Sequence, residues 1–535
     1  MLSYRKLAMR VLGRPLHTEG IDSPRPASQR AAAFILTAAM LTTLAAPAFA
    51  DIWHIENGDI TISAGESGNN VTQNNNTTYG DTNTIITNQN KDTASSHTVT
   101  IEAKDKDDKV EVTLKDVNID TSSRNKAAVS VTGEGDTNIK LDGDNALKSD
   151  IYRSGIYGSG SGSLTISGGE NDSLTAQGGS GANGISSSGS LTISGGTVTA
   201  NGDDGGRGIS SSGSVTISGG STVTANGGSG TISGGDGICS SGGVTISGGS
   251  TVTANGGNGG SLVGGDGIRS DGGVTISGGT VKAAGGDSKD GYGGDGIRSG
   301  GGVTISGNTV NAAGGYGGKV GGYGICSFDR VAISGGTVEA AGGNGSTGGG
   351  SGIYSSVIDL SGSLELTAKA GSPNGKALSQ KGSELVLDTI KDKLGPGAKV
   401  TATDADGKVI DQVSTPRPVE PEESSSSSDG GSAAPSAPAS PLPGLTVTDK
   451  DGQRISYTST QSGNTLTVCV GRLTASFRIS LAALRQLRAE GIETIAFQTV
   501  LCSTTLSVDE LLAMGGENAE AVLTHRFTDS SLTVG

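Results

Sequence analysis

Residues 237–254 read GICSSGGVTISGGSTVTA, and this stretch recurs with small changes from about Gly155 to Ala340. The isoleucine that stands second in it, Ile238, returns in each copy after a step of 24 to 30 residues. A repeat of this length is typical of a solenoid, in which each unit buries its apolar face only against its neighbours. The stretch therefore predicts the architecture of most of the chain.

Each repeat contains three short apolar pieces, which in the quoted copy are Gly237–Ile238, Val244–Ser247 and Thr251–Ala254. The second and third pieces alternate apolar and polar residues, which indicates strands with one buried face. The glycine pairs between them allow sharp turns, and no piece is long enough for an amphipathic helix. We therefore predict an all-β fold, a parallel β-helix with three short strands per coil, most regular over 151–363.

Stacked coils place equivalent residues in columns about 4.8 Å apart. The inner columns are predicted to be Val215, Val244, Val274, Val303 and Val331; Val223, Val252, Val281, Val310 and Val338; and Ala225, Ala254, Ala283, Ala312 and Ala340. Such a core is thin and rich in β-branched residues. It explains how a chain that is only 33% hydrophobic and 3% aromatic can fold.

The rest of the chain divides by composition. Residues 1–50 carry basic residues, then an apolar run, then Ala48-Phe49-Ala50, the pattern of a cleavable signal peptide, so we expect no transmembrane helix in the mature chain. The remaining predicted segments are an N-terminal cap with the first coils (51–150), a C-terminal cap (364–413), a disordered Pro/Ser linker (414–444) and a small α+β domain (445–535).

Composition also limits the chemistry. The formal net charge of −15 argues against nucleic acid as a partner, and none of the four histidines lies in the repeats, which argues against Ser-His-Asp or Cys-His catalysis there. We therefore expect a protein that is not an enzyme. Cys469 and Cys502 both lie in the C-terminal domain, where they either pair as a disulfide or stay free.

Two groups of aspartates are candidate calcium ligands. Asp236, Asp266 and Asp295 occupy the same GGDGI slot in consecutive coils, where their mutual repulsion calls for a cation or for an arginine three residues later. The alternative is a salt-bridged, solvated edge formed with Arg269 and Arg298. The second candidate group is Asp116, Asp120, Asp142 and Asp144, for which the alternative is an ordinary acidic turn.

Binding residues are expected on the loops that follow the third strand of each coil, because these loops vary in length and all lie on one side of the rod. They carry Tyr292, Tyr316 and Tyr323. Tyrosine can stack on a sugar ring and also hydrogen-bond to it, so these tyrosines, with Arg269 and Arg298, are the candidate carbohydrate-binding residues. The alternative is that the tyrosines only cover glycine-rich backbone.

Three blocks of sequence, at Val112–Asp120, Ala128–Val131 and Ile139–Asn145, together with the LTISGG repeats, resemble secreted clostridial carbohydrate-binding β-helix proteins. The resemblance covers roughly 51–413. It implies a right-handed parallel β-helix similar to that of polysaccharide lyases, bound calcium, and binding of plant cell-wall polysaccharides without clear catalysis.

These observations lead to one functional hypothesis with two alternatives. The leading hypothesis is a secreted bacterial protein, free or attached to the cell surface, whose β-helix binds polysaccharide or a cell-surface glycan without cleaving it. The first alternative is a structural spacer or adhesin stalk that presents the C-terminal domain. The less favoured alternative is a calcium-dependent polysaccharide lyase, in which Arg269 or Arg298 would abstract a proton.

Overall fold

The structure is a computed structural model that describes residues 51–416, 444–448, 454–455, 457–462, 464–470, 474–499, 503–514, 519–525 and 530–534. The chain forms two compact units, one ending at Pro418 and the other beginning at Val419. The predicted signal peptide and residues 417–443, which include most of the predicted linker, lie outside the described residues. No helix within the described ranges is long and apolar enough to cross a membrane.

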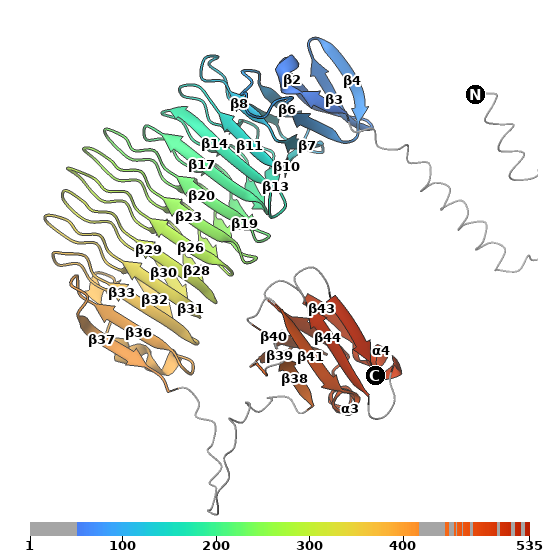
Figure 1. The fold of residues 1–535 in the computed structure, drawn as a ribbon. Helices are drawn as coiled ribbons and strands as arrows, with labels where there is room; N and C mark the ends of the chain where they lie inside the picture. Colours follow the sequence, from blue (N-terminus) through green and yellow to red (C-terminus); the bar gives the residue numbers. More distant parts are fainter. Residues whose placement is uncertain are drawn as a thin grey trace, which may run out of the picture. The chain divides into compact units, whose positions relative to one another are not determined.

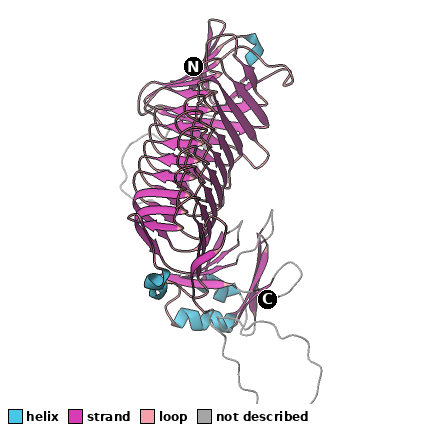
Figure 2. Ribbon diagram, turned by 90° about the vertical axis from the view of Figure 1, so that its left-hand side faces the viewer, coloured by secondary structure: helices cyan, strands magenta, loops and turns pink. Residues whose placement is uncertain are grey.

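The first unit is a parallel β-helix, as the repeat predicts (Figure 1). One regular coil contains β18 (Ile209–Ser211), β19 (Val215–Ser218) and β20 (Thr222–Asn226). Each of these strands pairs in parallel with the equivalent strand of the next coil. The three stacks of strands are called the first, second and third faces, in the order of these three strands. Figure 2 shows the coils stacked one upon another, with strands in every coil.

The faces run through most of the unit. The first face contains β2 (Ile60–Gly65), β6 (Val99–Ala103), β9 (Val129–Gly133), β12 (Ile156–Gly158), β15 (Ile185–Ser187), β18, β21 (Ile238–Ser240), β24 (Ile268–Ser270), β27 (Ile297–Ser299), the first parts of β30 (Ile325–Ile333) and β32 (Ile353–Leu360), and β34 (Leu378–Gln380). The second face contains β1 (Ile52–His54), β5 (Thr84–Thr87), β7 (Lys109–Lys115), β10 (Asp136–Asp142), β13 (Leu164–Ser167), β16 (Leu191–Ser194), β19, β22 (Val244–Ile246), β25 (Val274–Ile276), β28 (Val303–Ile305) and the last parts of β30 and β32.

The third face is a separate sheet of 12 strands. It contains β8 (Asn118–Asp120), β11 (Asp144–Lys148), β14 (Ser173–Ser180), β17 (Thr197–Asp203), β20, β23 (Thr251–Asn255), β26 (Thr280–Ala284), β29 (Asn308–Ala313), β31 (Gly336–Ala341), β33 (Leu364–Lys369), β36 (Lys399–Thr403) and β37 (Val409–Ser414). All of its neighbouring strands pair in parallel except β36 and β37, which are antiparallel.

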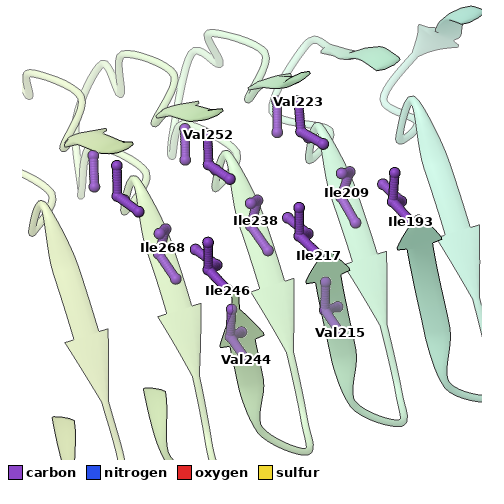
Figure 3. Close-up of a cluster of buried hydrophobic side chains, with 14 of the residues drawn as sticks. Ile193, Ile209, Val215, Ile217, Val223, Ile238, Val244, Ile246, Val252 and Ile268 are labelled. Atoms are coloured by element: carbon purple, nitrogen blue, oxygen red, sulfur yellow. The ribbon is translucent and has the colours of Figure 1, made fainter. Parts of the chain in front are cut away.

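The core consists of the predicted aliphatic columns, which the structure confirms. Val215 is in register with Val244 on the second face, and Val223 is in register with Val252 on the third. Their side chains are at most 1% exposed. Figure 3 shows these residues and the isoleucines between them projecting into the interior of successive coils. Because every coil adds the same side chains at the same places, the core stays narrow along its whole length.

A buried serine column explains the serine of the repeated I-x-S motif. The hydroxyl of Ser240 donates to the carbonyl of Gly213 at 2.8 Å, and that of Ser270 donates to the carbonyl of Gly242 at 2.7 Å. Both serines are fully or almost fully buried, and each bond reaches the turn of the preceding coil. The buried hydroxyl thus finds an acceptor in a turn carbonyl, which also accepts a backbone N–H from the next coil.

Antiparallel strands stand at both ends of the β-helix. At one end β3 (Gly68–Gln73) pairs with β2, and β4 (Asn76–Asp81) pairs with β3. At the other end β37 pairs with β36, and β35 (Ser383–Glu384) pairs with β34. Two short 3-10 helices, η1 (Ile55–Asn57) and η2 (Leu387–Lys393), lie in the same end regions. These elements interrupt the open edges of the stack, which would otherwise invite end-to-end pairing.

The second unit is a small α+β domain, as predicted. Its two four-stranded sheets contain β38 (Leu445–Thr448), β41 (Ala475–Ser480), β44 (Glu520–His525) and β45 (Ser530–Val534) in one, and β39 (Thr458–Ser462), β40 (Thr465–Cys469), β42 (Thr494–Gln498) and β43 (Ser503–Ser507) in the other. Its described helices are α3 (Leu481–Ala489) and α4 (Val508–Met514). The hydroxyl of Ser480 caps α3 by accepting the Ala483 N–H.

Candidate functional site

The predicted aspartate ladder exists, and it is buried. Asp236, Asp266 and Asp295 stand immediately before the first-face strands of consecutive coils and are 3–6% exposed. Oδ1 of Asp236 accepts the backbone N–H of Asp266 at 2.9 Å, and Oδ1 of Asp266 accepts the N–H of Asp295 at 2.7 Å. Oδ1 of Asp295 in turn accepts the N–H of Tyr323 at 2.7 Å. One oxygen of each carboxyl group therefore joins its coil to the next.

The second oxygen of each carboxyl group, Oδ2, has different hydrogen-bond partners in different coils. Oδ2 of Asp236 accepts from Nε of Arg207 at 3.1 Å, and Oδ2 of Asp295 accepts from Nη1 of Arg298 at 3.3 Å. Within the described part of the chain, Oδ2 of Asp266 has no hydrogen-bond partner, and the guanidinium of Arg269 has neither a hydrogen bond nor an ion pair. The predicted salt-bridged edge is therefore present in two coils and open in the one between them.

Burial and crowding raise the pKa values of two of these carboxyl groups. Burial raises the pKa of Asp295 to about 6, although the Tyr323 N–H and the Arg298 guanidinium act in the opposite direction. Burial, followed by the charges of Asp295 and Asp236, raises the pKa of Asp266 well above its usual range. The environment thus favours the protonated form of Asp266.

A cavity of about 410 Å³ lies beside this ladder. Its charged and polar lining comes from Asn183, Arg207, Asp236, Asp266 and Arg269, and glycines of the neighbouring loops complete it. Its volume falls within the usual range for small-molecule sites, about 300–1,000 Å³. The unpaired Asp266 and Arg269 both face it.

The loop after the third strand supplies the opposite side of the cavity, where Ser233 and Val263 line it. These two residues form a bridged column with Tyr292 and Val320, one residue from each successive coil. Tyr292 is therefore the next member of the column that lines the cavity, and its side chain is 52% exposed. The structure brings this predicted tyrosine to the edge of the site.

These loops are held together by contacts between backbones. The N–H of Gly265 donates to Gly257 O within its own coil, and Gly265 O accepts from Gly286 N of the next coil, both at 2.8 Å. A Cβ at Gly265 would lie 1.9 Å from the carbonyl oxygen of Gly235. Glycine is required here because no side chain fits between backbones this close. The loops are thus ordered walls built from a glycine lattice.

An aromatic group continues the site along the first face. The rings of Tyr323 and Tyr354 are stacked, with centroids 5.0 Å apart and planes at 21°. The guanidinium of Arg298 lies 5.4 Å from the centroid of the Phe328 ring, which belongs to a side chain that is 54% exposed. We call Tyr323, Tyr354 and Phe328 the aromatic group. The stacked tyrosines are partly buried and Phe328 is exposed, so the group offers flat apolar faces next to polar groups.

The column of Arg269 links the cavity to the aromatic group. On the first face Cys239, Arg269, Arg298, Cys326 and Tyr354 are in register in five successive coils. The predicted residues Arg269, Arg298 and Tyr323 thus lie in one continuous region, to which the structure adds residues that the sequence reasoning did not select. These additions are Asn183, Arg207, Phe328 and Tyr354.

Tyr316 is not among the residues that line the cavity. Its N–H donates to Oδ1 of Asp287 at 2.7 Å, and its carbonyl accepts from the N–H of Ser288 at 2.8 Å, so it stacks on a column other than that of Tyr292. Its side chain is 46% exposed. The structure therefore separates Tyr316 from Tyr292 and Tyr323, with which the sequence grouped it.

The predicted calcium ligands form salt bridges and hydrogen bonds with nearby residues. In the N-terminal acidic group, Lys115 pairs with Asp142 at 2.7 Å and Lys148 pairs with Asp120 at 3.0 Å, while Oδ1 of Asp116 accepts the N–H of Asp144 at 3.2 Å. Across the residues that the structure describes, no three His, Cys, Asp or Glu side chains converge in a way that would hold a metal ion. Calcium binding stays a prediction from the sequence.

Cys469 carries a free thiol, which donates to Oε1 of Gln498 at 3.1 Å. Cys502, its predicted partner, lies outside the described residues. In the sheet, β42 lies between β40, which ends at Cys469, and β43, which begins immediately after Cys502.

The chain matches no known protein-family model, and neither a characterised protein nor a solved structure matches it significantly. The resemblance to clostridial carbohydrate-binding proteins therefore rests on the quoted sequence blocks and on the β-helix architecture.

Proposed function

We propose that this protein is an extracellular carbohydrate-binding protein whose β-helix holds a polysaccharide along its first face without cleaving it. The observation that carries the proposal is the alignment of the cavity and the aromatic group in the same columns. From Arg207 to Tyr354 these columns cross five coil-to-coil steps, or about 24 Å at the usual strand spacing. A linear ligand suits such a site better than a compact one.

The chemistry of the surface supports a sugar ligand. Stacked tyrosines offer flat faces to pyranose rings, while guanidinium and carboxyl groups hydrogen-bond to hydroxyl groups. The loops form ordered walls, so binding would cost little ordering entropy. The signal-peptide pattern of residues 1–50 supports an extracellular location. The sequence-based prediction of bound calcium is tested in the same way: the binding assay is run with calcium and with chelator.

The electrostatics of the site work against the lyase alternative. A lyase whose catalytic base is an arginine needs that arginine to give up its proton. Burial alone would lower the pKa of Arg298, but the neighbouring Asp295, which accepts from its guanidinium, outweighs burial, and that pKa is raised above its usual value. Arg298 is thus held in its charged form. We therefore assign Arg298 to ligand binding.

The test is binding of the protein to a panel of immobilised polysaccharides, with calcium and with chelator. We expect Tyr354→Ala to weaken binding by about tenfold, because it removes half of the stacked pair. Tyr79→Ala is the matched control, since Tyr79 is a 77% exposed tyrosine on β4, at one end of the β-helix. Equal binding by the wild type and Tyr354→Ala would contradict the assignment of the site.

The same assay addresses a second candidate function, a spacer that presents the C-terminal domain. The observation in its favour is that the chain from Val419 onward forms a compact unit of its own, with a separate hydrophobic core. No binding by the wild-type protein to any polysaccharide, with or without calcium, would favour this function and would direct attention to the second unit.

A further inference from the structure

We propose that the tips of the glycine-rich loops form an interface through which two copies of this chain associate side by side, running in opposite directions. The starting point is a group of apolar side chains on these tips, which we call the apolar ridge. It contains Ile232, Leu262 and Tyr292, which are 63%, 53% and 52% exposed, and the half-buried Val263 and Val320. The inference goes beyond the proposed function, since it concerns a protein partner and not the ligand.

The apolar ridge is continuous across four coils. The N–H of Leu262 donates to Ile232 O, and the N–H of Tyr292 donates to Leu262 O, both at 2.9 Å. Val263, Tyr292 and Val320 are bridged to one another in successive coils. Single exposed apolar side chains are normal on a protein surface, but a contiguous patch of them is typical of an interaction site. The glycine lattice beneath keeps the ridge ordered, so a partner would have little to order on binding.

Charged side chains of opposite sign stand at the two ends of the apolar ridge. Asp204 lies in the loop two coils before Leu262, beside the equally exposed Asp203. Lys319 lies in the loop two coils after Leu262 and is also exposed. Within the described ranges, none of these three charged side chains forms a salt bridge. The ridge is therefore acidic at one end and basic at the other, and neither charge is compensated.

This pattern of charge fits a second copy of the same chain that is turned end for end. A two-fold axis through Leu262 brings this residue against its own copy and brings Ile232 against Tyr292 of the other copy. The same axis places Lys319 of each copy opposite Asp204 of the other, because both stand two coils from Leu262. Association in the parallel direction would oppose Lys319 to Lys319, and like charges in an interface are unfavourable.

The remaining charges of the loop tips are compatible with the same axis. Lys289 and Asp290 lie in the loop that carries Tyr292, and they would face the uncharged tip around Ile232. From Asp204 to Lys319 the contact crosses four coil-to-coil steps, or about 19 Å at the usual strand spacing. Stable dimers bury about 1,200–2,000 Å² in total, and a ridge this narrow offers less. We therefore expect a weak dimer that forms at high protein concentration.

The test is analytical ultracentrifugation of the full chain over a range of concentrations. We expect the wild type to show a reversible equilibrium between monomer and dimer. Leu262→Asp should weaken dimerisation about tenfold or more, because it places two unpaired charges at the centre of the interface. Val386→Asp is the matched control, since Val386 is a 59% exposed valine that precedes η2 at the end of the β-helix, and it should dimerise like the wild type.

A pair of charge reversals tests the direction of association. Lys319→Glu should weaken the dimer, because it opposes two carboxylates across the interface at both ends. Adding Asp204→Lys to the same chain should restore dimerisation, since each copy then again has one acidic and one basic end. In a parallel dimer, by contrast, the double variant would still oppose like charges and would show no rescue.

The outcomes do not depend on carbohydrate binding, because no carbohydrate is present in the assay. A wild type that remains monomeric at every concentration would overturn the proposal, as would a dimer that Leu262→Asp leaves intact. A double variant that fails to regain dimerisation would overturn the antiparallel arrangement. Circular dichroism checks that each variant is folded, and Ile232→Asp, at the next exposed tip of the ridge, carries the same expectation if Leu262→Asp does not fold.

Discussion

At the scale of single residues, the aspartate column combines a structural and a chemical role in the same side chain. One oxygen of each carboxyl group holds the amide of the next coil, and the other oxygen faces an arginine or the cavity. A carboxyl group used in this way must be buried, and burial makes its charge expensive. The column therefore couples the stability of three coils to pH.

Asp295 makes the free energy of unfolding depend on pH in a way that can be measured. Its pKa is raised to about 6 by burial, so the folded protein holds a proton that the unfolded chain, with an aspartate pKa of about 3.9, has already released. The stabilisation is complete below about pH 3.9 and is lost as the pH rises to about 6. We expect the free energy of unfolding to fall by about 2–3 kcal/mol across this window, measured by urea denaturation.

The substitution Asp295→Asn should reduce that slope, and the part that comes from the raised pKa of Asp266 should remain. The amide keeps an oxygen for the Tyr323 N–H but cannot titrate. Asp271→Asn is the control, because Asp271 is an exposed aspartate on a turn of the neighbouring coil and should leave the slope unchanged. By contrast, the pKa of Asp59 is lowered, although burial acts to raise it. The stability that Asp59 contributes to the fold is therefore lost only as the pH falls. A slope that is unchanged in Asp295→Asn would contradict the assignment.

At the scale of elements, the glycine-rich loops behave as part of the β-helix rather than as appendages. Their backbone N–H and C=O groups bond both within a coil and between coils, as the bonds of Gly257, Gly265 and Gly286 show. In this lattice the main chain itself provides the packing surface. Residues such as Tyr292 are displayed from it at fixed intervals.

The lattice predicts a large difference between two glycines. In Gly265→Ala the new Cβ would lie 1.9 Å from the Gly235 carbonyl oxygen, so the loops must separate, and we expect a loss of about 3 kcal/mol or more in thermal unfolding. In Gly249→Ala nothing lies within 4 Å of the Cβ, and only the backbone angle of φ +73° is unfavourable. That variant should lose about 1–2 kcal/mol. Similar losses in both would argue against the lattice.

The repeat allowed the fold to be predicted in detail because equal slots, such as those of Val215 and Val244, become columns when coils stack. The same reasoning placed Asp266 beside Arg269. It did not select Tyr354, which fills the variable position of the G-I-x-S motif, or Phe328, which lies where β30 runs through the turn that separates two strands in regular coils. The sequence also could not show that the glycine-rich loops form an ordered lattice and are not simply variable loops. Closely packed backbones require glycine, and glycine alone does not distinguish these two cases.

At the scale of the whole molecule, the two units have separate cores. The core of the first extends from Ile55 to Val413, and that of the second from Leu445 to Leu523, and no residue belongs to both. Units with independent cores are expected to unfold independently. We therefore expect that the second unit can be lost or altered while the β-helix keeps its structure.

The single tryptophan makes this independence testable. Trp53 packs against the core of the β-helix, and its Nε1 donates to Oδ2 of Asp81 at 3.0 Å. Tryptophan fluorescence should therefore follow the unfolding of the first unit alone, while calorimetry should show two transitions. Phe477→Ala, which empties a buried site against Phe497 in the second unit, should lower only one transition, by about 3–5 kcal/mol of unfolding free energy. The fluorescence transition should not move. If it moved together with the other transition, the two cores would unfold as one, and the second unit would contribute to the stability of the β-helix.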